Sequence, residues 1–245
     1  MLIAIHQLHY LPWLRYIHKL ASADIFIVLD NIQFNKNGWQ NRNRIKTAQG
    51  VRILTVPVLH KFAQNLDEVT IDNKQPWQRK HWGAIQNSYR KAPYFSEHEP
   101  FLKRIYETSS WDKLNDLNYE MLFYFVKVMG IKTKILKGCD IMMQGEATDR
   151  LVYLCQFANE NKSGPAAGTT YLTGAFAAGQ YLDTALFEKA GIQLAVQGFT
   201  APEYPQLHPD QGFIPELSVL DLLLNCGTRS LEMLMNSANS RSGAS

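Results

Sequence analysis

The sequence predicts an α/β fold, in which an N-terminal βαβ unit belongs to a mainly parallel sheet and a helical portion lies toward the C-terminus. Two short apolar runs, residues 2–5 and 25–29, flank a segment in which apolar residues recur at helical spacing. Hydrophobic residues make up 46% of the chain and charged residues 19%, which is an ordinary globular mixture. At 245 residues the chain is long enough for a substantial core, and we expect one domain over residues 1–245 with a helical part at roughly 75–130.

The first βαβ unit places two polar residues at strand ends. Residues 2–5 are too few for a helix and fit a buried strand, which His6 ends. Pro12 suits the first turn of the helix that follows, and the second strand, residues 25–29, stops at Asp30. Because both strands of such a unit point the same way, their carboxyl ends meet at one edge of the sheet, where open α/β sheets bind ligands. We therefore expect His6 and Asp30 at that edge.

The rest of the chain continues as strands, helices and loops. The polar segment 31–50 is expected to be a loop, followed by two strands that could pair as a hairpin, residues 51–59 and 66–71. Helices are expected at 75–89, 101–106, 111–129, 148–158, 184–190 and 218–226, with interruptions at Pro93 and Pro100, and further strands at 133–136 and 193–197. Residues 163–179 hold four glycines among small residues and are expected to form a flexible loop or a close-approach element. No Gly-Lys-Ser/Thr follows them, so they match no P-loop.

Charge and composition argue against several classes of protein. The formal net charge of +3 is too mild to predict a nucleic-acid partner. No run approaches the roughly 18 apolar residues that span a bilayer, and the N-terminus lacks the features of a signal peptide, so we expect a cytoplasmic protein with no membrane span. Cys139, Cys155 and Cys226 are far apart and show no CxxC spacing, which favours reduced thiols over a zinc site or a disulfide framework. Because no HExxH motif or carboxylate cluster is present, we expect neither a metal nor a cofactor.

Several motifs of the chain resemble one known family. The start of the WbqC-like protein family is similar to residues 3–47, IAIHQLHYLPWLRYIHKLASADIFIVLDNIQFNKNGWQNRNRIKT, and LTVPV at 54–58, APYF at 92–95 and FIPELSVLDLLLNCG at 213–227 extend the likeness. The resemblance implies a link to polysaccharide and O-antigen biosynthesis, because members of the family occur with such genes and are described as glycine or acyl transferases. The chain departs from the family's usual opening in carrying Leu8 in place of proline and His9 where asparagine or another polar residue is common.

His6 is the strongest candidate for a catalytic group. An imidazole at the carboxyl end of a buried strand is fixed in position, faces a ligand crevice and titrates near neutrality, so His6 could act as a general base. The alternative is a histidine that bonds to a neighbouring backbone group and braces the strand-to-helix turn. Asp30 could orient His6 or hold a substrate amine, and it could equally cap a turn.

His6 and His9 together form HxxH ahead of a helix. This pattern loosely resembles the paired histidines of nucleotidylyltransferases, which bind phosphate at a helix start. That motif needs glycine before the second histidine for close phosphate approach, and Leu8 stands there in this chain. A plain exposed His9 is the alternative.

A polar and basic segment after the second strand predicts contacts with phosphate. Three cations stand within eight positions, together with amides and an aromatic ring, and guanidinium groups suit phosphate bidentately. A solvated basic loop is the alternative. A second group of candidates lies in a proline-rich loop that could present lid contacts at low entropic cost. The substrate-binding residues that we expect are Gln7, Tyr10, Trp13, Gln33, Trp39, Asn41, Arg42, Asn43, Arg44, Lys46, Tyr204 and Gln206.

Asp221 stands out in the last predicted helix because its neighbours are mostly leucines. A buried carboxylate needs a partner, which Arg42 or Arg44 could supply. An exposed helix face is the competing explanation.

The resemblance and the candidate residues together predict a transferase. We expect it to move an acyl or aminoacyl (glycyl) group to an amino group of a nucleotide-linked sugar, with His6 as general base. The substrate is then a phosphate-containing small molecule, either a nucleotide sugar or an acyl carrier, and backbone N–H groups near Pro12 could stabilise the oxyanion. The reaction class comes from the resemblance and not from the residues. The alternatives are a nucleotidylyltransferase-like enzyme that uses His6 and His9, and a non-catalytic protein that binds a sugar nucleotide or serves as a scaffold.

Overall fold

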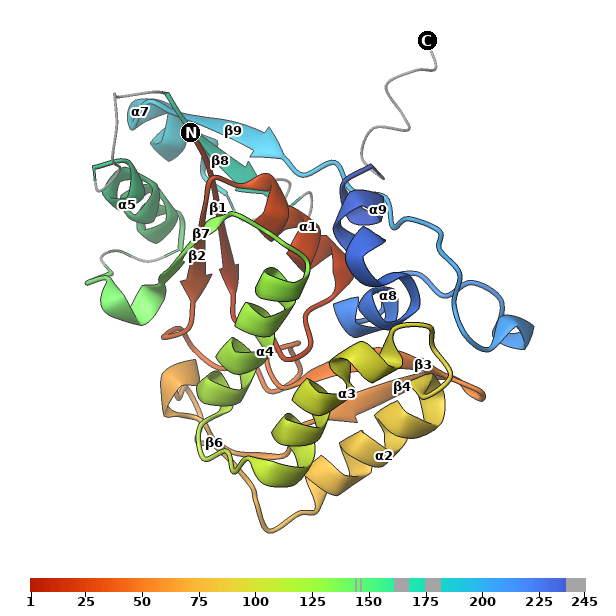
Figure 1. The fold of residues 1–245 in the computed structure, drawn as a ribbon. Helices are drawn as coiled ribbons and strands as arrows, with labels where there is room; N and C mark the ends of the chain where they lie inside the picture. The colour runs from red at the N-terminus through yellow and green to blue at the C-terminus, as the bar shows by residue number, and fades with distance from the viewer. Residues whose placement is uncertain (144, 146, 161–167, 175–181, 237–245) are drawn as a thin grey trace. The chain divides into compact units, whose positions relative to one another are not determined.

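The fold is given by a computed structural model, which describes residues 1–143, 145, 147–160, 168–174 and 182–236 (Figure 1). The chain divides into two compact units. The sheet unit comprises Met1–Gln7, His18–Asp30 and Lys132–Phe199, and the helical unit comprises Leu8–Ile17, Asn31–Ile131 and the residues from Thr200 onward. The predicted helical part falls in the helical unit, and the single domain over residues 1–245 stays a prediction.

The sheet unit is built on five strands. Its strands are β1 (Leu2–Gln7), β2 (Ile25–Leu29), β7 (Lys134–Lys137), β8 (Thr169–Thr173) and β9 (Ile192–Val196), and its helices are α5 (Ala147–Glu160) and α7 (Thr184–Lys189), with a 3-10 turn at Gly138–Asp140. Helix α1 (Leu14–Ser22) crosses the division between the units after Ile17. The strand order is β7-β2-β1-β8-β9, and every neighbouring pair is parallel. The predicted α/β class with a mainly parallel sheet is confirmed.

The order of the strands is that of a doubly wound sheet. Numbered by their appearance within this sheet, the strands follow the order 3-2-1-4-5. The chain moves outward from β1 through β2 to β7, and it then returns to the other side of β1 with β8 and β9. The direction of winding therefore reverses between β1 and β8, and in open α/β sheets the carboxyl ends at such a reversal are the usual place for a ligand.

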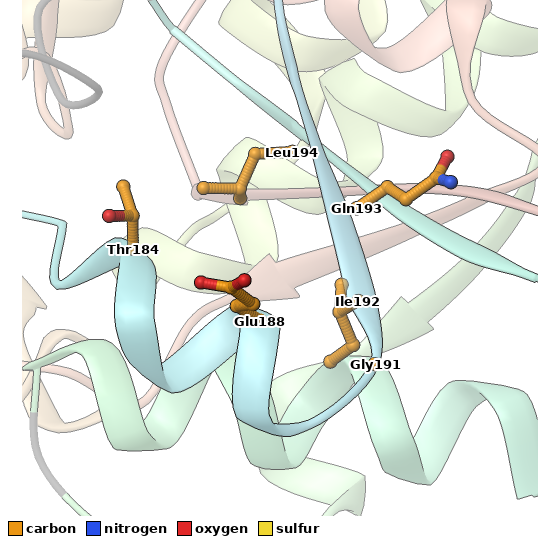
Figure 2. A pocket seen from close by; sticks show the side chains of 6 residues that line it. All are labelled: Thr184, Glu188, Gly191, Ile192, Gln193 and Leu194. Carbon is orange, nitrogen blue, oxygen red and sulfur yellow. The ribbon is translucent and has the colours of Figure 1, made fainter.

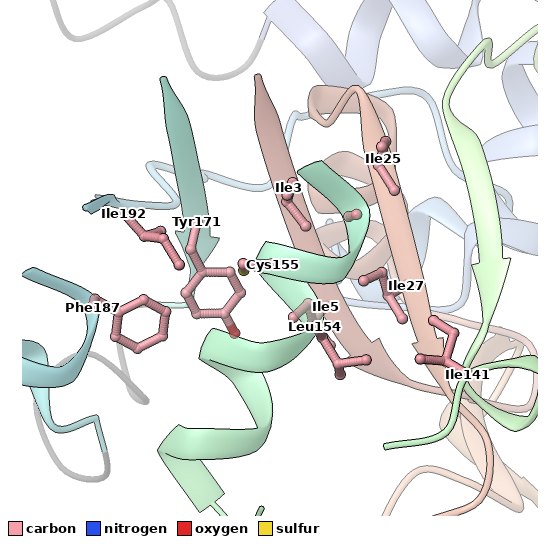
Figure 3. Close-up of a cluster of buried hydrophobic side chains, with 11 residues drawn as sticks. Ile3, Ile5, Ile25, Ile27, Ile141, Leu154, Cys155, Tyr171, Phe187 and Ile192 are labelled. Carbon is pink, nitrogen blue, oxygen red and sulfur yellow. The ribbon is translucent and has the colours of Figure 1, made fainter. Parts of the chain in front are cut away.

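Helices α5 and α7 cover one face of this sheet (Figure 3). Alternate residues of a strand project to the same face, so Ile3 and Ile5 of β1 point toward the same helices as Tyr171 of β8. The ring of Tyr171 stacks on Phe187 of α7 with a centroid separation of 5.3 Å. The cluster of buried residues consists of Ile3, Ile5, Ile25, Ile27, Ile141, Leu154, Cys155, Ala158, Tyr171, Phe187 and Ile192. Burial of each large apolar side chain contributes about 1.5–3 kcal/mol, so this cluster fixes the strands and the position of their carboxyl ends.

The helical unit contains two antiparallel strand pairs and most of the helices. Its strands are β3 (Arg42–Thr47), β4 (Gly50–Thr55), β5 (Val58–Leu59) and β6 (Thr70–Ile71), and its helices are α2 (Trp77–Tyr89), α3 (Phe95–Lys103), α4 (Leu114–Val128), α8 (Val219–Cys226) and α9 (Ser230–Asn236). A π-helical segment follows α3 at Arg104–Thr108, and short 3-10 turns lie at Leu66–Glu68, Pro209–Gln211 and Gly227–Arg229. Of the predicted hairpin of 51–59 with 66–71, only the last residues pair, as β5 with β6, whereas the greater part of 51–59 is β4 and pairs with β3. Ser218 begins α8 as predicted, because its side chain accepts a hydrogen bond from the Leu220 N–H.

Three expectations about single elements are wrong. The predicted loop 31–50 contains β3, which was missed because buried polar residues such as Asn43 and Lys46 hide the apolar alternation of a strand. The predicted loop 163–179 contains β8 at Thr169–Thr173, while residues 163–167 and 175–179 lie outside the described residues. Pro100 lies inside α3 and does not interrupt it.

Candidate functional site

The carboxyl end of β1 separates from one of its neighbours. β1 pairs with β2 as far as Gln7, whereas its pairing with β8 ends at Ala4. The last residues of β1 therefore continue alongside β2 and leave β8, at the point where the strand order reverses. His6 lies on this last part of β1, which is where the sequence placed it.

His6 is partly exposed, and its imidazole contacts the backbone of the next residue. Nδ1 lies 3.2 Å from the carbonyl oxygen of Gln7, and because a carbonyl only accepts, Nδ1 carries the proton and the lone pair is on Nε2. Burial, and then the Lys19 ammonium, lower the pKa of His6 to about 3. The ring is therefore neutral at physiological pH, which is the form that accepts a proton. The bond to Gln7 is also the backbone contact expected of a bracing histidine.

Asp30 follows β2 and caps a turn. It is buried, and its Oδ1 accepts a hydrogen bond of 2.7 Å from the Cys139 N–H in the turn that follows β7. Burial and the Asp30 carboxylate raise the pKa of the Cys139 thiol to about 12, so this exposed cysteine is not a thiolate at neutral pH. Among the roles left open by the sequence, this bond supports the capping role.

Lys19 is a buried cation that no sequence pattern predicts. Only 5% of its surface is exposed, and its Nζ donates a hydrogen bond of 2.9 Å to the carbonyl oxygen of Ile5. The ammonium lies 5.6 Å from the centroid of the Tyr171 ring. Burial lowers the pKa of Lys19 to about 8, so it remains mostly protonated at pH 7. A lysine on a helix is usually solvated, so nothing in the sequence marks this one.

The segment after β9 adds a second polar pair to the sheet unit. Gln197 Nε2 donates a hydrogen bond of 2.9 Å to Nδ1 of His18, and the His18 ring lies 5.0 Å from that of Phe199. Both His18 and Gln197 are buried. They hold the end of β9 to α1.

In the helical unit, four of the predicted ligand contacts lie together. Arg42 and Arg44 are two residues apart on β3, and their guanidinium carbons lie 5.5 and 4.8 Å from the centroid of the Trp39 ring. The Trp13 ring lies 5.1 Å from that of Trp39 at an interplanar angle of 60°. All four side chains are partly exposed, and among the described residues neither arginine forms an ion pair. We name these four residues the arginine–tryptophan cluster.

His9 belongs to the helical unit, whereas His6 belongs to the sheet unit. It is 4% exposed, and its ring lies 5.7 Å from that of Trp13 and 5.3 Å from that of Tyr16. Leu8 beside it is fully buried. These surroundings favour a packing role for His9.

Three further predicted contacts are buried and bond to the protein itself. Asn43 Nδ2 donates to the Leu11 carbonyl at 2.7 Å, and Asn41 Nδ2 donates to the Val56 carbonyl at 2.9 Å. The Tyr10 hydroxyl contacts Nδ1 of His81 at 2.8 Å and the hydroxyl of Tyr106 at 2.6 Å. Burial lowers the pKa of His81 to about 4, so this contact involves a neutral ring. These bonds fix the helical unit's own backbone and side chains.

Lys46, Gln206 and Tyr204 form part of a second buried network. Lys46 Nζ donates to the Gly212 carbonyl at 2.6 Å and to Gln206 Oε1 at 3.2 Å. Its ammonium is thereby held inside the unit, and only 1% of the residue is exposed. The Tyr204 hydroxyl donates a hydrogen bond of 2.9 Å to Asp221 Oδ1. The proline-rich loop that carries Tyr204 and Gln206 is tied down by these contacts.

Asp221 is fully buried and finds its partners among hydroxyl groups. The Tyr89 hydroxyl donates to Oδ2 at 2.7 Å, in addition to the bond from Tyr204. Burial raises the pKa of Asp221, while these two hydrogen bonds and the Lys46 charge oppose the rise. The expected partner, Arg42 or Arg44, is wrong, because both guanidinium groups lie beside Trp39.

The last two predicted contacts are more exposed. Gln7 is the final residue of β1 and is partly exposed, and its carbonyl accepts the bond from His6. Gln33 is exposed, and its backbone pairs with that of Asn65 in the helical unit.

A separate hollow lies away from the carboxyl ends of the strands. It has a volume of about 420 Å³ and lies between α7 and the first part of β9 (Figure 2). Its lining consists of Thr184, Glu188, Gly191, Ile192, Gln193 and Leu194.

In the described ranges, no three His, Cys, Asp or Glu side chains are placed to hold a metal ion. The helices of the described residues include none that is long and apolar enough to cross a bilayer.

The topology and the polar side chains at the strand ends define a doubly wound α/β protein with a candidate ligand site at the carboxyl edge of its sheet. The chain belongs to the WbqC-like protein family, whose profile matches residues 7–233, and this confirms the resemblance. It is 35% identical over 235 residues to "Uncharacterized protein Rv1507c" of Mycobacterium tuberculosis, with 95% of this chain and 96% of that protein covered. No solved structure gives a significant match.

Proposed function

We propose that this chain is a cytoplasmic transferase of polysaccharide or O-antigen biosynthesis, which moves an acyl or aminoacyl group from an activated carrier to an amino group of a nucleotide-linked sugar. Membership of the WbqC-like family supports the biological setting. Cys139, Cys155 and Cys226 are free thiols, which fits a reducing compartment. The proposal assigns His6 as the general base.

The observation that carries the proposal is the place of His6 in the sheet. Its imidazole stands at the carboxyl end of β1, where the strand order reverses, and it is neutral with the lone pair on Nε2. Ligands of open α/β sheets bind at this kind of position. A neutral imidazole that is partly exposed there is suited to take a proton from a bound amine.

In the proposed reaction, His6 first accepts a proton from the amine and then donates it to the leaving group. As the substrate nitrogen attacks the acyl carbon, the C–N bond forms and His6 takes the proton of the amine. The tetrahedral intermediate then collapses, the bond between the acyl carbon and its carrier breaks, and the imidazolium returns the proton to the leaving group. Because the pKa of His6 is low without a ligand, the imidazolium is a strong acid, which favours this second transfer. An anionic substrate nearby would raise the pKa and strengthen the base.

The other predicted residues take binding and positioning roles in this proposal. The guanidinium groups of the arginine–tryptophan cluster suit phosphate oxygens, and its indole rings suit a nucleobase. As a separate proposal that concerns the helical unit alone, we propose that this cluster binds a nucleotide. Asp30 acts as a positioning residue, because its bond to Cys139 ties the end of β2, the strand that pairs with β1, to the turn after β7.

A product assay tests the proposed function. The full chain is incubated with a UDP-linked amino sugar and with acetyl-CoA or a glycyl donor, and the products are analysed by mass spectrometry. A UDP-linked N-acyl or N-glycyl sugar is the expected product. Thermal stabilisation by the UDP-linked amino sugar without transfer from any donor would point to the non-catalytic alternative. Magnesium-dependent release of pyrophosphate from a nucleoside triphosphate, lost in both His6→Gln and His9→Gln, would point to nucleotidyl transfer.

A further inference from the structure

The Lys19 ammonium occupies a place in the sheet that a backbone N–H would otherwise fill. The Met1 carbonyl accepts from the Thr170 N–H of β8, and the Leu2 carbonyl accepts from the Asp24 N–H next to β2. Successive carbonyls of a strand alternate between its two neighbours, so the Ile5 carbonyl points toward the β8 side. There it accepts its hydrogen bond from Lys19 Nζ.

The surroundings of the ammonium show that it lies in the gap where β1 and β8 part. The regular pairing of the two strands ends at Ala4, one residue before the carbonyl that Lys19 binds. Lys19 comes from α1, yet it lies over the ring of Tyr171, which belongs to the cluster beneath α5. The charge of Lys19 also reaches His6 and Cys155, because it lowers the pKa of each. The side chain thus enters the sheet at the point of reversal.

This charge lacks an anionic counterpart in the described part of the chain. Lys19 is 5% exposed, and it forms no ion pair with a described carboxylate. Its neighbours there are a carbonyl oxygen, an aromatic ring and the thiol of Cys155, whose pKa burial raises to about 12. Buried charges in proteins are normally paired, so an ammonium in such surroundings is costly unless an anion binds to it.

We propose that Lys19 is the anion-binding residue of the carboxyl-edge site and that it binds a phosphate group of the ligand beside His6. The proposal rests on the proposed function for the location of the ligand, and it adds the group that receives its charge. Phosphate is the anion that doubly wound sheets commonly bind at the reversal point. A phosphate at Lys19 neutralises the charge that depresses His6, so binding also moves the imidazole toward its ordinary basicity.

Phosphate binding to Lys19 variants tests this proposal. Inorganic phosphate is titrated by calorimetry into wild type, Lys19→Met, Lys19→Gln and Lys134→Met in a phosphate-free buffer. Lys134→Met removes a charge from an exposed lysine of β7 and is the matched control. We expect both Lys19 variants to lose at least about tenfold in affinity, while Lys134→Met binds as wild type does. Lys19→Gln retains a donor for the Ile5 carbonyl, so it tests the proposal even if Lys19→Met fails to fold.

Two further arms identify the source of the phosphate and the titrating group. UDP and coenzyme A, tested in the same way, show whether the nucleotide sugar or the acyl carrier supplies the phosphate, since only the true source loses affinity in Lys19→Gln. Sulfate keeps its charge across the pH range, whereas Lys19 loses its proton as the pH rises through its pKa of about 8, so the affinity of wild type for sulfate should fall there. The titratable groups that surround Lys19 are His6, Tyr171 and Cys155. A merely structural lysine would not produce this pH profile.

The outcomes separate this proposal from the proposed function. Equal affinity for phosphate in wild type and Lys19→Gln, or no binding to either, overturns the role of Lys19 and leaves the transferase to be judged by its own product assay. Loss of phosphate binding in Lys19→Gln together with an absence of any acyl transfer supports Lys19 and counts against the transferase.

Discussion

The depressed pKa of His6 predicts that replacing this residue changes how stability depends on pH. His6 resists protonation in the folded chain, where burial and Lys19 lower its pKa from 6.5 to about 3. In the unfolded chain the imidazole binds a proton below pH 6.5. Between these two values the unfolded state therefore holds more protons, so the free energy of unfolding falls as the pH falls.

The magnitude follows from the size of the window. Each pH unit below 6.5 costs about 1.4 kcal/mol, and lowering the pH from 7 to 5 crosses about 1.5 such units. The full effect is about 2 kcal/mol, and because His6 is partly exposed we expect about 1–2 kcal/mol. His6→Gln lacks a titrating group, so this share of the acid destabilisation should disappear.

Urea unfolding at pH 7 and at pH 5 measures the effect. The quantity of interest is the loss of unfolding free energy between the two pH values in wild type minus that in His6→Gln. His60→Gln, which removes a histidine of the helical unit, is the control for the loss of a histidine as such. An equal loss in wild type and His6→Gln would refute the claim that the ring at the end of β1 is kept neutral by its surroundings.

Three other predictions concern individual residues of the two units. Tyr89→Phe removes the bond to Asp221 and leaves the Lys46 N–H without its acceptor, so it should lower the free energy of unfolding by about 2–4 kcal/mol in denaturant titrations. Tyr204→Phe removes only a bond to Asp221 and should cost less, and equal costs for the two variants would contradict this prediction. The double variant Arg42→Met/Arg44→Met should weaken UDP binding in calorimetry by at least about tenfold. The control Arg15→Met, which breaks the pair with Glu216, should leave the UDP affinity unchanged, and an unchanged affinity in the double variant would show that the cluster does not bind UDP. Asp30→Ala should lower the free energy of unfolding by about 1–2 kcal/mol through the lost bond to Cys139, whereas Asp30→Asn keeps an oxygen acceptor and should cost less. If thermal melts show Asp30→Asn to be the less stable of the two, the capping role is disproved.

The first βαβ unit could be predicted from the sequence because its signals are local. The apolar runs at 2–5 and 25–29 are continuous and end at polar residues, and the structure has β1 and β2 at those positions. β8 was missed because its residues, Thr169–Thr173, stand in a region of small residues and glycines that favours a loop. Its place beside β1 depends on pairing with residues more than 160 positions away, as in the register of Leu2 with Thr170.

The candidate site was predicted in part, for a reason that concerns polar residues in general. His6 in the sheet unit and the arginine–tryptophan cluster in the helical unit lie at partly exposed positions. Asn43 and Lys46 have the same chemistry, yet they bond to carbonyl groups inside the helical unit. Composition cannot distinguish a polar side chain that satisfies the protein's own backbone from one that meets a ligand.

The burial of Lys19, in contrast, could not be predicted from the sequence. Its helix predicts a solvated lysine, and its burial results from the separation of β1 and β8, which is a property of the sheet and not of α1. The residues around it are Ile5, Cys155 and Tyr171, which come from three different elements. A pattern within α1 contains no information on any of them.

The rate of acyl transfer by His6→Gln tests the central claim most directly. With a saturating UDP-linked amino sugar and acyl donor, removal of a general base should lower kcat by about 10²–10⁴-fold, while the Kd for the UDP-linked sugar stays within about twofold of the wild-type value. Turnover by His6→Gln at the wild-type rate, with the substrate bound as tightly as before, would show that the imidazole at the end of β1 takes no part in the chemistry.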